Sequence, residues 1–333
     1  MNDYIYRWIQ MRSSSEGWLA VQQKASKSLS LFYTSTGGQA WKEVTPTSAP
    51  ILTAFAFTST TAYAVSEKRN SPSSLIVWGT MNRGRNWNSA VIVLPLKAQE
   101  HIQKVVIEFH NEAHGSLCIM TSEQKHLYKT FDRGLTWNKV SSFLINGMVT
   151  GLTFVNDQVG FLTVKGNKLY RSLYQTNDFG KTWSPAYFVS VAALLYPLTT
   201  DATAYKPLYV DGSIFVPFKI TGPVLNSLFY YYSNNFGKTW RMTPAVPYRG
   251  GAFSFPTSKS CLIANGSSGA LYEQQSPLYI GKIYAQNEAL KNMHCLHFVD
   301  RSIGFGCTKE KLYTTKDGGK TWSSLSFKLL FHQ

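Results

Sequence analysis

Apolar, aromatic and β-branched residues recur along the chain in short runs that are separated by Gly, Asn, Ser and Pro. Examples of these runs are "LSLFYTS", "SLIVWGT", "KLYRSLYQT" and "SLFYYYS". Short runs bounded by turn residues are typical of β-strands. No long segment has apolar residues at the spacing of a helix. The pattern therefore predicts an all-β protein built from many short strands.

A polar eight-residue motif follows many of these runs. Its form is Ser/Thr-x-Asp-x-Gly-x-Thr-Trp, and some copies lack the acid or the second hydroxyl; Asn235, for example, replaces the acid in the fifth copy. A catalytic group is rarely needed six times, so the repetition favours a structural role. The copies span residues 34–41, 80–87, 130–137, 176–183, 233–240 and 315–322.

The spacing of the motif predicts the number of repeats. Successive motif tryptophans are 46, 50, 46, 57 and 82 residues apart, and the last step is about twice the usual one. A second landmark, a small or turn residue followed by an apolar strand, occurs seven times. One of its copies, "KSCLIA" at Lys259, lies where no motif is found. Repeats of this length are typical of solenoids, propellers or arrays.

Four short strands per repeat, closed in a ring, make a β-propeller, which leaves only short and protected edges. We therefore predict a single seven-bladed β-propeller domain over residues 1–333, with four antiparallel strands in each blade. The sixth blade, at about residues 245–290, lacks the motif.

The motif is expected to form the hairpin turn between the third and fourth strands of a blade. Its Gly tolerates a positive φ. The Asp is expected to accept hydrogen bonds from backbone N–H groups and from the Thr hydroxyl, while the Trp covers the hairpin. The residues given these structural roles are Asp132, Gly134, Thr136, Trp137, Asp178, Gly180, Thr182, Trp183, Asn235, Gly237, Trp240, Asp317, Gly319, Thr321 and Trp322.

The motif and its spacing resemble the Asp-box, or BNR, repeat of sialidases, xyloglucanase-type glycosidases, sortilin-type receptors and photosystem II assembly-factor propellers. "TKDGGKTW", together with a Gly-Phe or Gly-Trp strand that precedes such a motif, looks most like the assembly-factor-like bacterial propellers. The resemblance extends from Arg12 to Trp322 and implies the propeller fold. It does not specify a function, which has to be argued from a site.

Charge is the strongest indication of function. The chain has 33 Lys and Arg residues against 18 Asp and Glu, a formal net charge of +15. In a propeller, the loops between strands two and three share one face with the inter-blade connections, and the box turns lie on the other. The strand two-to-three loops are rich in Lys, which predicts a face that attracts an acidic protein or an anionic cell-surface polymer. An alternative is that these lysines are ordinary solvated loop residues, since the box face is basic as well.

The sequence also singles out one inter-blade loop. Tyr248 and Arg249, in "VPYRGG", are expected to be exposed at the rim of the channel, where Tyr and Arg often anchor an interface. The residues predicted to bind a partner are Lys24, Lys27, Lys68, Arg69, Lys125, Lys165, Lys168, Lys219, Tyr248, Arg249, Lys309 and Lys311.

An enzyme of the glycoside hydrolase class is the alternative. Such enzymes use two carboxylates on either side of the scissile bond. No spacing singles out a pair among the acids outside the boxes, and the Arg-Ile-Pro expected of a sialidase is missing. We therefore predict a non-catalytic, monomeric binding or assembly module without a cofactor. Nucleic acid is not the expected partner, because its usual recognition modules are missing. The candidate acids near the predicted site face include Glu67, Glu100, Asp201, Asp211, Glu273 and Glu288.

Cysteine and histidine give further expectations. Cys118 and Cys261 are predicted to be buried thiols. Cys295 and Cys307 flank a predicted hairpin and could be cross-strand neighbours, with their redox state open. His294 lies beside Cys295, but at strand spacing it faces away from the next histidine, so structural histidines and no metal site are expected.

No segment is long and apolar enough to span a bilayer as a helix. The first residues have no apolar leader and enter a strand-like run almost at once. From this and from the family resemblance, we expect a secreted or surface-anchored protein whose leader is absent from this chain. A cytoplasmic protein is the alternative.

Overall fold

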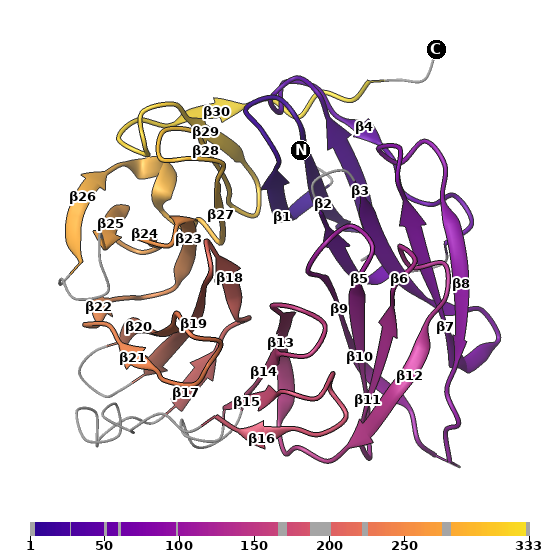
Figure 1. Ribbon diagram of the computed structural model, residues 1–333. Coiled ribbons are helices and arrows are strands. Elements are labelled where there is room, and N and C mark those ends of the chain that lie inside the picture. The colour runs from indigo at the N-terminus through magenta and orange to yellow at the C-terminus, as the bar shows by residue number, and fades with distance from the viewer. Residues whose placement is uncertain are drawn as a thin grey trace. The chain divides into compact units, whose positions relative to one another are not determined.

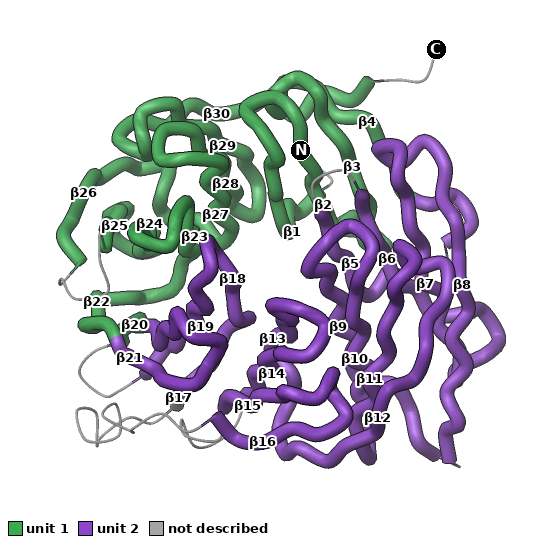
Figure 2. The backbone as a smooth tube through the Cα atoms, viewed as in Figure 1, with its two compact units in different colours: residues 1–45, 225–229, 243–333 green, residues 46–224, 230–242 purple. Residues whose placement is uncertain are grey.

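The computed structural model describes residues 4–26, 28–49, 52–58, 61–97, 99–165, 172–186, 201–221, 226–274 and 281–330. These residues form seven antiparallel sheets, each made of strands that are consecutive in the chain. The fold is a seven-bladed β-propeller, as the sequence predicted. The chain divides into two compact units, Met1–Thr45, Leu225–Phe229 and Thr243–Gln333 (unit 1) and Pro46–Val224 and Tyr230–Met242 (unit 2) (Figure 2).

Unit 2 contains three sheets of four strands, in the orders β5-β6-β7-β8, β9-β10-β11-β12 and β13-β14-β15-β16 (Figure 1). Their strands are β5 (Leu52–Phe57), β6 (Ala62–Lys68), β7 (Ser71–Thr80), β8 (Asn88–Val93), β9 (Ile102–Phe109), β10 (Gly115–Thr121), β11 (Lys125–Thr130), β12 (Asn138–Phe143), β13 (Met148–Phe154), β14 (Gly160–Lys165), β15 (Leu173–Thr176) and β16 (Ser184–Pro185).

A further sheet has the order β17-β19-β20-β21, with β18 on β19 and β22 on β20, and its β20 contributes residues to both units. Its strands are β17 (Asp201–Ala204), β18 (Leu208–Val210), β19 (Ser213–Thr221), β20 (Asn226–Ser233), β21 (Arg241–Met242) and β22 (Val246–Pro247).

Unit 1 contains three sheets of four strands and the one-turn 3-10 helix η2 (Glu288–Leu290). The strands are β1 (Tyr4–Met11), β2 (Gly17–Gln23), β3 (Leu29–Thr34), β4 (Lys42–Glu43), β23 (Gly251–Thr257), β24 (Ser260–Asn265), β25 (Ala270–Gln274), β26 (Lys282–Gln286), β27 (Cys295–Phe298), β28 (Gly304–Cys307), β29 (Leu312–Thr315) and β30 (Ser323–Leu325). No described helix is long and apolar enough to cross a membrane.

The cores lie between neighbouring sheets within each unit. In unit 2, β5 packs beside β9, and Val77, Ile107 and Leu117 belong to one buried cluster between their sheets. In unit 1, Leu19 and Phe305 belong to the cluster that joins the sheet of β1 to that of β27. Second strands are almost wholly buried while fourth strands such as β8 and β12 are largely exposed. The apolar runs of the sequence are therefore the middle strands of the sheets.

The first and last sheets of the chain share no strand, yet both belong to unit 1. The backbone of Trp41, next to β4, pairs with the segment that follows β30. Trp41 N donates to Lys328 O at 2.8 Å, and Leu330 N donates to Trp41 O at 2.8 Å. The C-terminal segment thus extends the first sheet by hydrogen bonds to its fourth-strand edge.

Candidate functional site

The box turn of residues 130–137 connects β11 to β12 and closes on its own carboxylate. Thr130 Oγ1 donates to Asp132 Oδ1 at 2.8 Å, and Thr136 N donates to the same oxygen at 2.9 Å. Thr136 Oγ1 donates to Oδ2 at 2.5 Å. Gly134 has a φ of 80°, which favours glycine. Trp137 Nε1 donates to Gly134 O at 3.1 Å, so the turn satisfies itself without a ligand.

The boxes at 176–183, 233–240 and 315–322 repeat this geometry. Hydrogen bonds from the Thr321 side chain and backbone lower the pKa of Asp317 to about 2. Asn235 accepts from Thr239 N at 3.0 Å and donates from Nδ2 to Thr239 Oγ1 at 2.8 Å, so the amide replaces the carboxylate. Box tryptophans pack edge-on against phenylalanines, in the pairs Phe109–Trp137, Phe154–Trp183, Phe161–Trp240 and Phe298–Trp322. The positive-φ glycines of the three boxes at 176–183, 233–240 and 315–322 are Gly180, Gly237 and Gly319, and the Thr182 hydroxyl donates to Asp178 Oδ2.

Seven of the twelve residues that the sequence predicts to bind a partner are exposed, and two are buried. Lys125 is 7% exposed, and its Nζ donates to the carbonyl of Ile145. Tyr248 is 1% exposed, and its hydroxyl donates to Gly251 O at 2.8 Å. The expectation that these two side chains lie at an exposed surface is wrong, because both are buried and each donates a hydrogen bond to a backbone carbonyl. Lys219 is half-buried, Lys27 and Lys168 lie outside the described residues, and the exposed members are Lys24, Lys68, Arg69, Lys165, Arg249, Lys309 and Lys311.

Unit 1 has a pocket of about 760 Å³ at the loops on which the sequence places the basic face. Three of the predicted cations, Arg249, Lys309 and Lys311, line it together with Lys291. Four loops contribute: the one before β23, the β24–β25 loop, the one before β27, and the β28–β29 loop. Its remaining lining residues are Gly250, Gly251, Gly266, Ser267, Glu288, Asn292, Met293, His294, Thr308, Glu310 and Tyr313.

Backbone hydrogen bonds tie three of these loops together. Gly266 N donates to Gly250 O at 2.7 Å, and Asn292 N donates to Gly266 O at 2.7 Å. A side chain cannot replace the hydrogen of Gly251, because its φ is 127° and a Cβ there would lie 2.1 Å from Ala264 O. The sequence found the cations of this pocket but not the part that the β24–β25 loop of the box-less sixth blade takes in it, through Gly266 and Ser267.

The charge of the pocket is positive. Four cations and two acids line the pocket. One of the acids, Glu288, forms an ion pair with Lys291 at 2.8 Å. Arg249, Lys309 and Lys311 are exposed and have no ion-pair partner among the described residues. Three cations that share no carboxylate at one pocket produce a field that attracts an anionic group.

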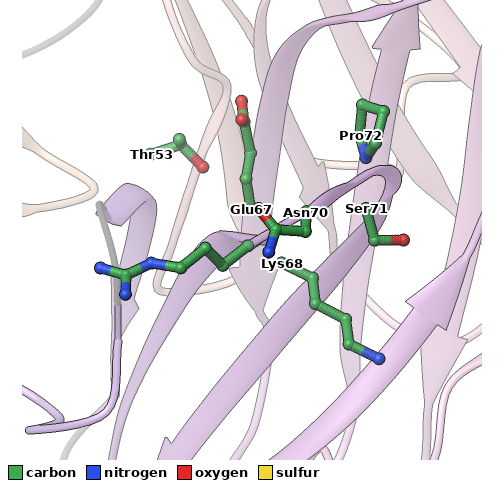
Figure 3. Close-up of a pocket in the computed structure, with 7 residues that line it drawn as sticks. Thr53, Glu67, Lys68, Asn70, Ser71 and Pro72 are labelled. Carbon is green, nitrogen blue, oxygen red and sulfur yellow. The ribbon is translucent and has the colours of Figure 1, made fainter.

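A second pocket, of about 490 Å³, lies at the tip of the β6–β7 hairpin in unit 2 (Figure 3). Lys68 and Arg69 line it with Glu67 and Thr53. The Glu67 and Lys68 side chains extend in different directions (Figure 3). The acid next to the two cations makes this pocket less positive than the one in unit 1.

Three described acids outside the boxes, Glu100, Glu108 and Glu273, make separate local hydrogen bonds. Glu100 is 8% exposed, and a hydrogen bond from Thr121 lowers its pKa. Glu108 is 3% exposed and accepts from Phe154 N at 2.8 Å; burial raises its pKa. Ser260 Oγ donates to Glu273 Oε1 at 3.3 Å. The side chain of Asp201 lies outside the described residues.

The cysteines occupy two environments. Cys118 and Cys261 are buried thiols as expected, and burial raises the pKa of Cys118 to about 12. Cys295 and Cys307 are directly opposite on β27 and β28 and form a disulfide. The nearby histidines bond to the backbone of β1: His294 Nε2 lies 2.9 Å from Tyr6 O, and His297 Nε2 lies 2.7 Å from Met11 O.

Comparisons with known proteins agree with this geometry. A family model described as BNR/Asp-box repeat matches residues 231–242. No curated protein matches the chain. Solved structures share its fold at low sequence identity, so their likeness concerns the fold alone.

Three of these structures illustrate the range of proteins that share this fold. The GH74 xyloglucanase from Xanthomonas campestris has 14% identity and a TM-score of 0.63 over 95% of this chain and 52% of its own, so the chain spans about half of that enzyme. YCF48 from Cyanidioschyzon merolae has 14% identity and a TM-score of 0.55 over 95% of this chain and 94% of its own. The β-propeller domain of the Trilobed protease from Pyrococcus furiosus has 10% identity and a TM-score of 0.57 over 98% of both chains.

Proposed function

We propose that this chain, a seven-bladed β-propeller with BNR/Asp-box repeats, is a non-catalytic binding or assembly module that acts as one domain over residues 1–333. Its partner is an acidic protein or an anionic cell-surface polymer. The pocket of Arg249, Lys291, Lys309 and Lys311 receives the acidic group, and the other exposed cations of the predicted face add to the attraction.

One observation carries this proposal. Loops that are far apart in sequence bring Arg249, Lys309 and Lys311 to one pocket without a carboxylate partner for any of them among the described residues. Three unpaired cations repel one another, so their gathering is more readily explained by an anionic partner than by stability. Lys predominates over Arg in the pocket, which suits diffuse attraction more than bidentate recognition of a single phosphate.

The likeness to a xyloglucanase motivates the alternative, a glycoside hydrolase. Its acid catalyst would need a raised pKa and access to substrate. Among the described carboxyl groups, burial raises the pKa at Glu108, but that side chain is 3% exposed and is bonded to Phe154 N–H. This observation favours the binding module over the enzyme.

The disulfide supports an extracytoplasmic location for the protein. Disulfides persist in oxidising compartments and are rare in the reducing cytosol of ordinary organisms. The Cys295–Cys307 pair therefore favours a secreted or surface-anchored protein, and we propose that it acts as a monomer.

Binding to an array of sulfated polysaccharides, polyphosphate and poly-glutamate tests the proposal, read at about 0.02 M and about 0.15 M salt. We expect binding at low salt that weakens as the salt screens the pocket. The triple variant Arg249→Glu, Lys309→Glu, Lys311→Glu should abolish it.

A matched control changes the same residue types elsewhere in unit 1. Arg301, Lys316 and Lys328 are exposed and outside the pocket, so their replacement by Glu changes the net charge equally. If both triple variants lose binding alike, net charge and not the pocket is responsible. If the wild-type protein binds none of the polymers but hydrolyses a polysaccharide, the enzyme alternative holds instead.

A further inference from the structure

Two histidines and an aspartate of unit 2 bring three metal-ligating atoms together, away from both pockets. His110 and His114 lie in the loop between β9 and β10, and Asp157 lies in the loop between β13 and β14. Asp157 Oδ1 is 3.3 Å from His110 Nε2 and 2.8 Å from His114 Nδ1. The three ligand atoms all lie within 4.8 Å of one another.

The repeat itself does not need these histidines. The same loop closes in other sheets by a backbone hydrogen bond that matches the one from His110 N to His114 O, at 3.2 Å. The equivalent bonds, 3.0 Å and 2.9 Å long, join Val155 to Val159 and Val299 to Ile303. Apolar side chains therefore serve at both histidine positions elsewhere in the fold, so closing the loop does not account for the two imidazoles.

The side chain of Asp157 is likewise not the one that closes its own turn. The neighbouring Asn156 closes that turn, because its Oδ1 accepts from Gln158 N at 2.9 Å and from Val159 N at 2.8 Å. The Asp157 carboxylate is left to face the two histidines of the neighbouring sheet. A carboxylate and two imidazoles thus converge from two loops that are more than 40 residues apart in the chain.

The spacing of the ligand atoms suits a small tetrahedral ion. Bonds of about 2.0–2.1 Å place neighbouring ligands of Zn²⁺ at roughly 3.3 Å from each other. The distances from Asp157 Oδ1, 3.3 Å and 2.8 Å, need only a small adjustment. The side chains of His110, His114 and Asp157 are 11%, 31% and 40% exposed, so solvent reaches one side of the cluster.

The surroundings hold the ligands in place. Lys129 Nζ donates to Asp157 O at 2.7 Å and fixes the backbone of that loop. Asn111 Oδ1 accepts from His114 N at 2.7 Å, and the Phe131 ring packs edge-on against His114 at 5.0 Å. The Lys129 ammonium opposes a cation nearby and reduces the expected affinity.

We propose that His110, His114 and Asp157 bind one divalent transition-metal ion, with Zn²⁺ the best match and a fourth position left to water or to an external ligand. Two imidazoles and one carboxylate suit Zn²⁺, Cu²⁺ or Ni²⁺. Ca²⁺ and Mg²⁺ require a shell of oxygen ligands that this cluster does not offer. The ion would join the β9–β10 loop to the β13–β14 loop.

Isothermal titration of the full, metal-stripped chain with Zn²⁺ tests the proposal. We expect one ion per chain and a Tm that rises with Zn²⁺. Both His114→Ala and Asp157→Asn should weaken the affinity by more than about tenfold. Co²⁺ substitution should give visible d–d bands without a thiolate charge-transfer band, which separates this site from the cysteines.

Two control variants accompany these. His101→Ala removes an exposed histidine outside the cluster, and His294→Ala removes the histidine next to Cys295 and Cys307. Both should leave Zn²⁺ binding unchanged. Asp157→Asn preserves shape, so its circular dichroism shows whether it folds, and shifts of the His110 and His114 ring protons upon Zn²⁺ addition report on the wild type directly. Absence of those shifts, or equal affinity in Asp157→Asn, overturns the proposal.

Discussion

Cys295 and Cys307 lie directly opposite each other on β27 and β28, with their Cα atoms 5.2 Å apart, and their sulfurs are bonded. The disulfide closes a short hairpin in the last blade, next to the strand on which the chain begins. The remaining thiols, Cys118 and Cys261, are buried. This arrangement makes a clear prediction for thiol counting.

We predict that a thiol reagent finds no reactive cysteine in the native protein. It should find two after denaturation without reductant and four after denaturation with reductant, because burial protects Cys118 and Cys261 and the disulfide protects the other pair. Four thiols in the unreduced, denatured chain would show that the pair is not oxidised in solution.

Loss of the disulfide should lower the free energy of unfolding by about 2–3 kcal/mol, as expected for a loop of this length. Urea unfolding of Cys307→Ser against wild type measures the change. Cys261→Ser is a control for the replacement of a buried sulfur. An equal loss in both variants would mean that packing, and not the cross-link, accounts for the effect.

The box turn predicts a difference between two substitutions of Asp317. Asp317→Ala removes the acceptor of Thr315 Oγ1, Thr321 N and Thr321 Oγ1, and should lower the stability by about 1–2 kcal/mol. Asp317→Asn should cost less, because Asn235 already makes the same turn. Thermal unfolding of the two variants provides the comparison, and equal losses would contradict the role of the acceptor.

The same carboxylate gives a pH dependence. Hydrogen bonds from Thr321 lower the pKa of Asp317 to about 2 in the folded state, below its ordinary value of 3.8. Its contribution to stability is therefore present above about pH 4 and is lost as the pH falls toward 2. Asp317→Asn should show a shallower decrease in stability over that window than wild type, measured by urea unfolding. Parallel curves would contradict the assignment.

Lys129 predicts a change at alkaline pH. Burial lowers its pKa to about 8, against an ordinary value of 10.5, and the ammonium lies 3.6 Å and 4.0 Å from the centroids of Phe154 and Phe179. Between about pH 8 and pH 10.5, Lys129 is protonated in the unfolded chain but largely neutral in the folded one. The unfolded chain therefore binds more protons than the folded chain, and the free energy of unfolding rises with pH. Relative to Lys129→Met, wild type should gain roughly 1–3 kcal/mol from pH 7.5 to 10, measured with a chelator present. A difference in the free energy of unfolding between wild type and Lys129→Met that stays constant with pH would contradict the lowered pKa of Lys129.

Two neighbouring glycines that line the unit 1 pocket, Gly250 and Gly251, are predicted to differ in how much a substitution by Ala destabilises the protein. Gly251→Ala should be strongly destabilising, since its Cβ would lie 2.1 Å from Ala264 O. Gly250→Ala meets no atom within 4 Å and should cost only the strain of its positive φ, about 1–2 kcal/mol. Denaturant unfolding of both variants tests this, and similar losses would place the strain in the backbone alone.

Much of the fold follows from short-range features of the sequence. The apolar runs, the turn residues between them and the seven landmarks predict strands and blades, because strand formation and repeat spacing are readable along the chain. The box roles were equally predictable, since Asp132, Thr136 and Gly134 bond within one eight-residue turn. The sequence could not decide the state of Cys295 and Cys307, which needs the register of two strands.

What the sequence by itself determined about this protein is its repeat, its boxes and its excess of basic loop residues. Only the tertiary structure decided which of those residues reach solvent: Lys125, at the start of β11, and Tyr248, in the loop before β23, are buried, whereas Lys309 is exposed. The tertiary structure also brings His110 and His114 close to Asp157. Exposure and convergence depend on segments distant in the chain, and no local pattern records which segment packs against which.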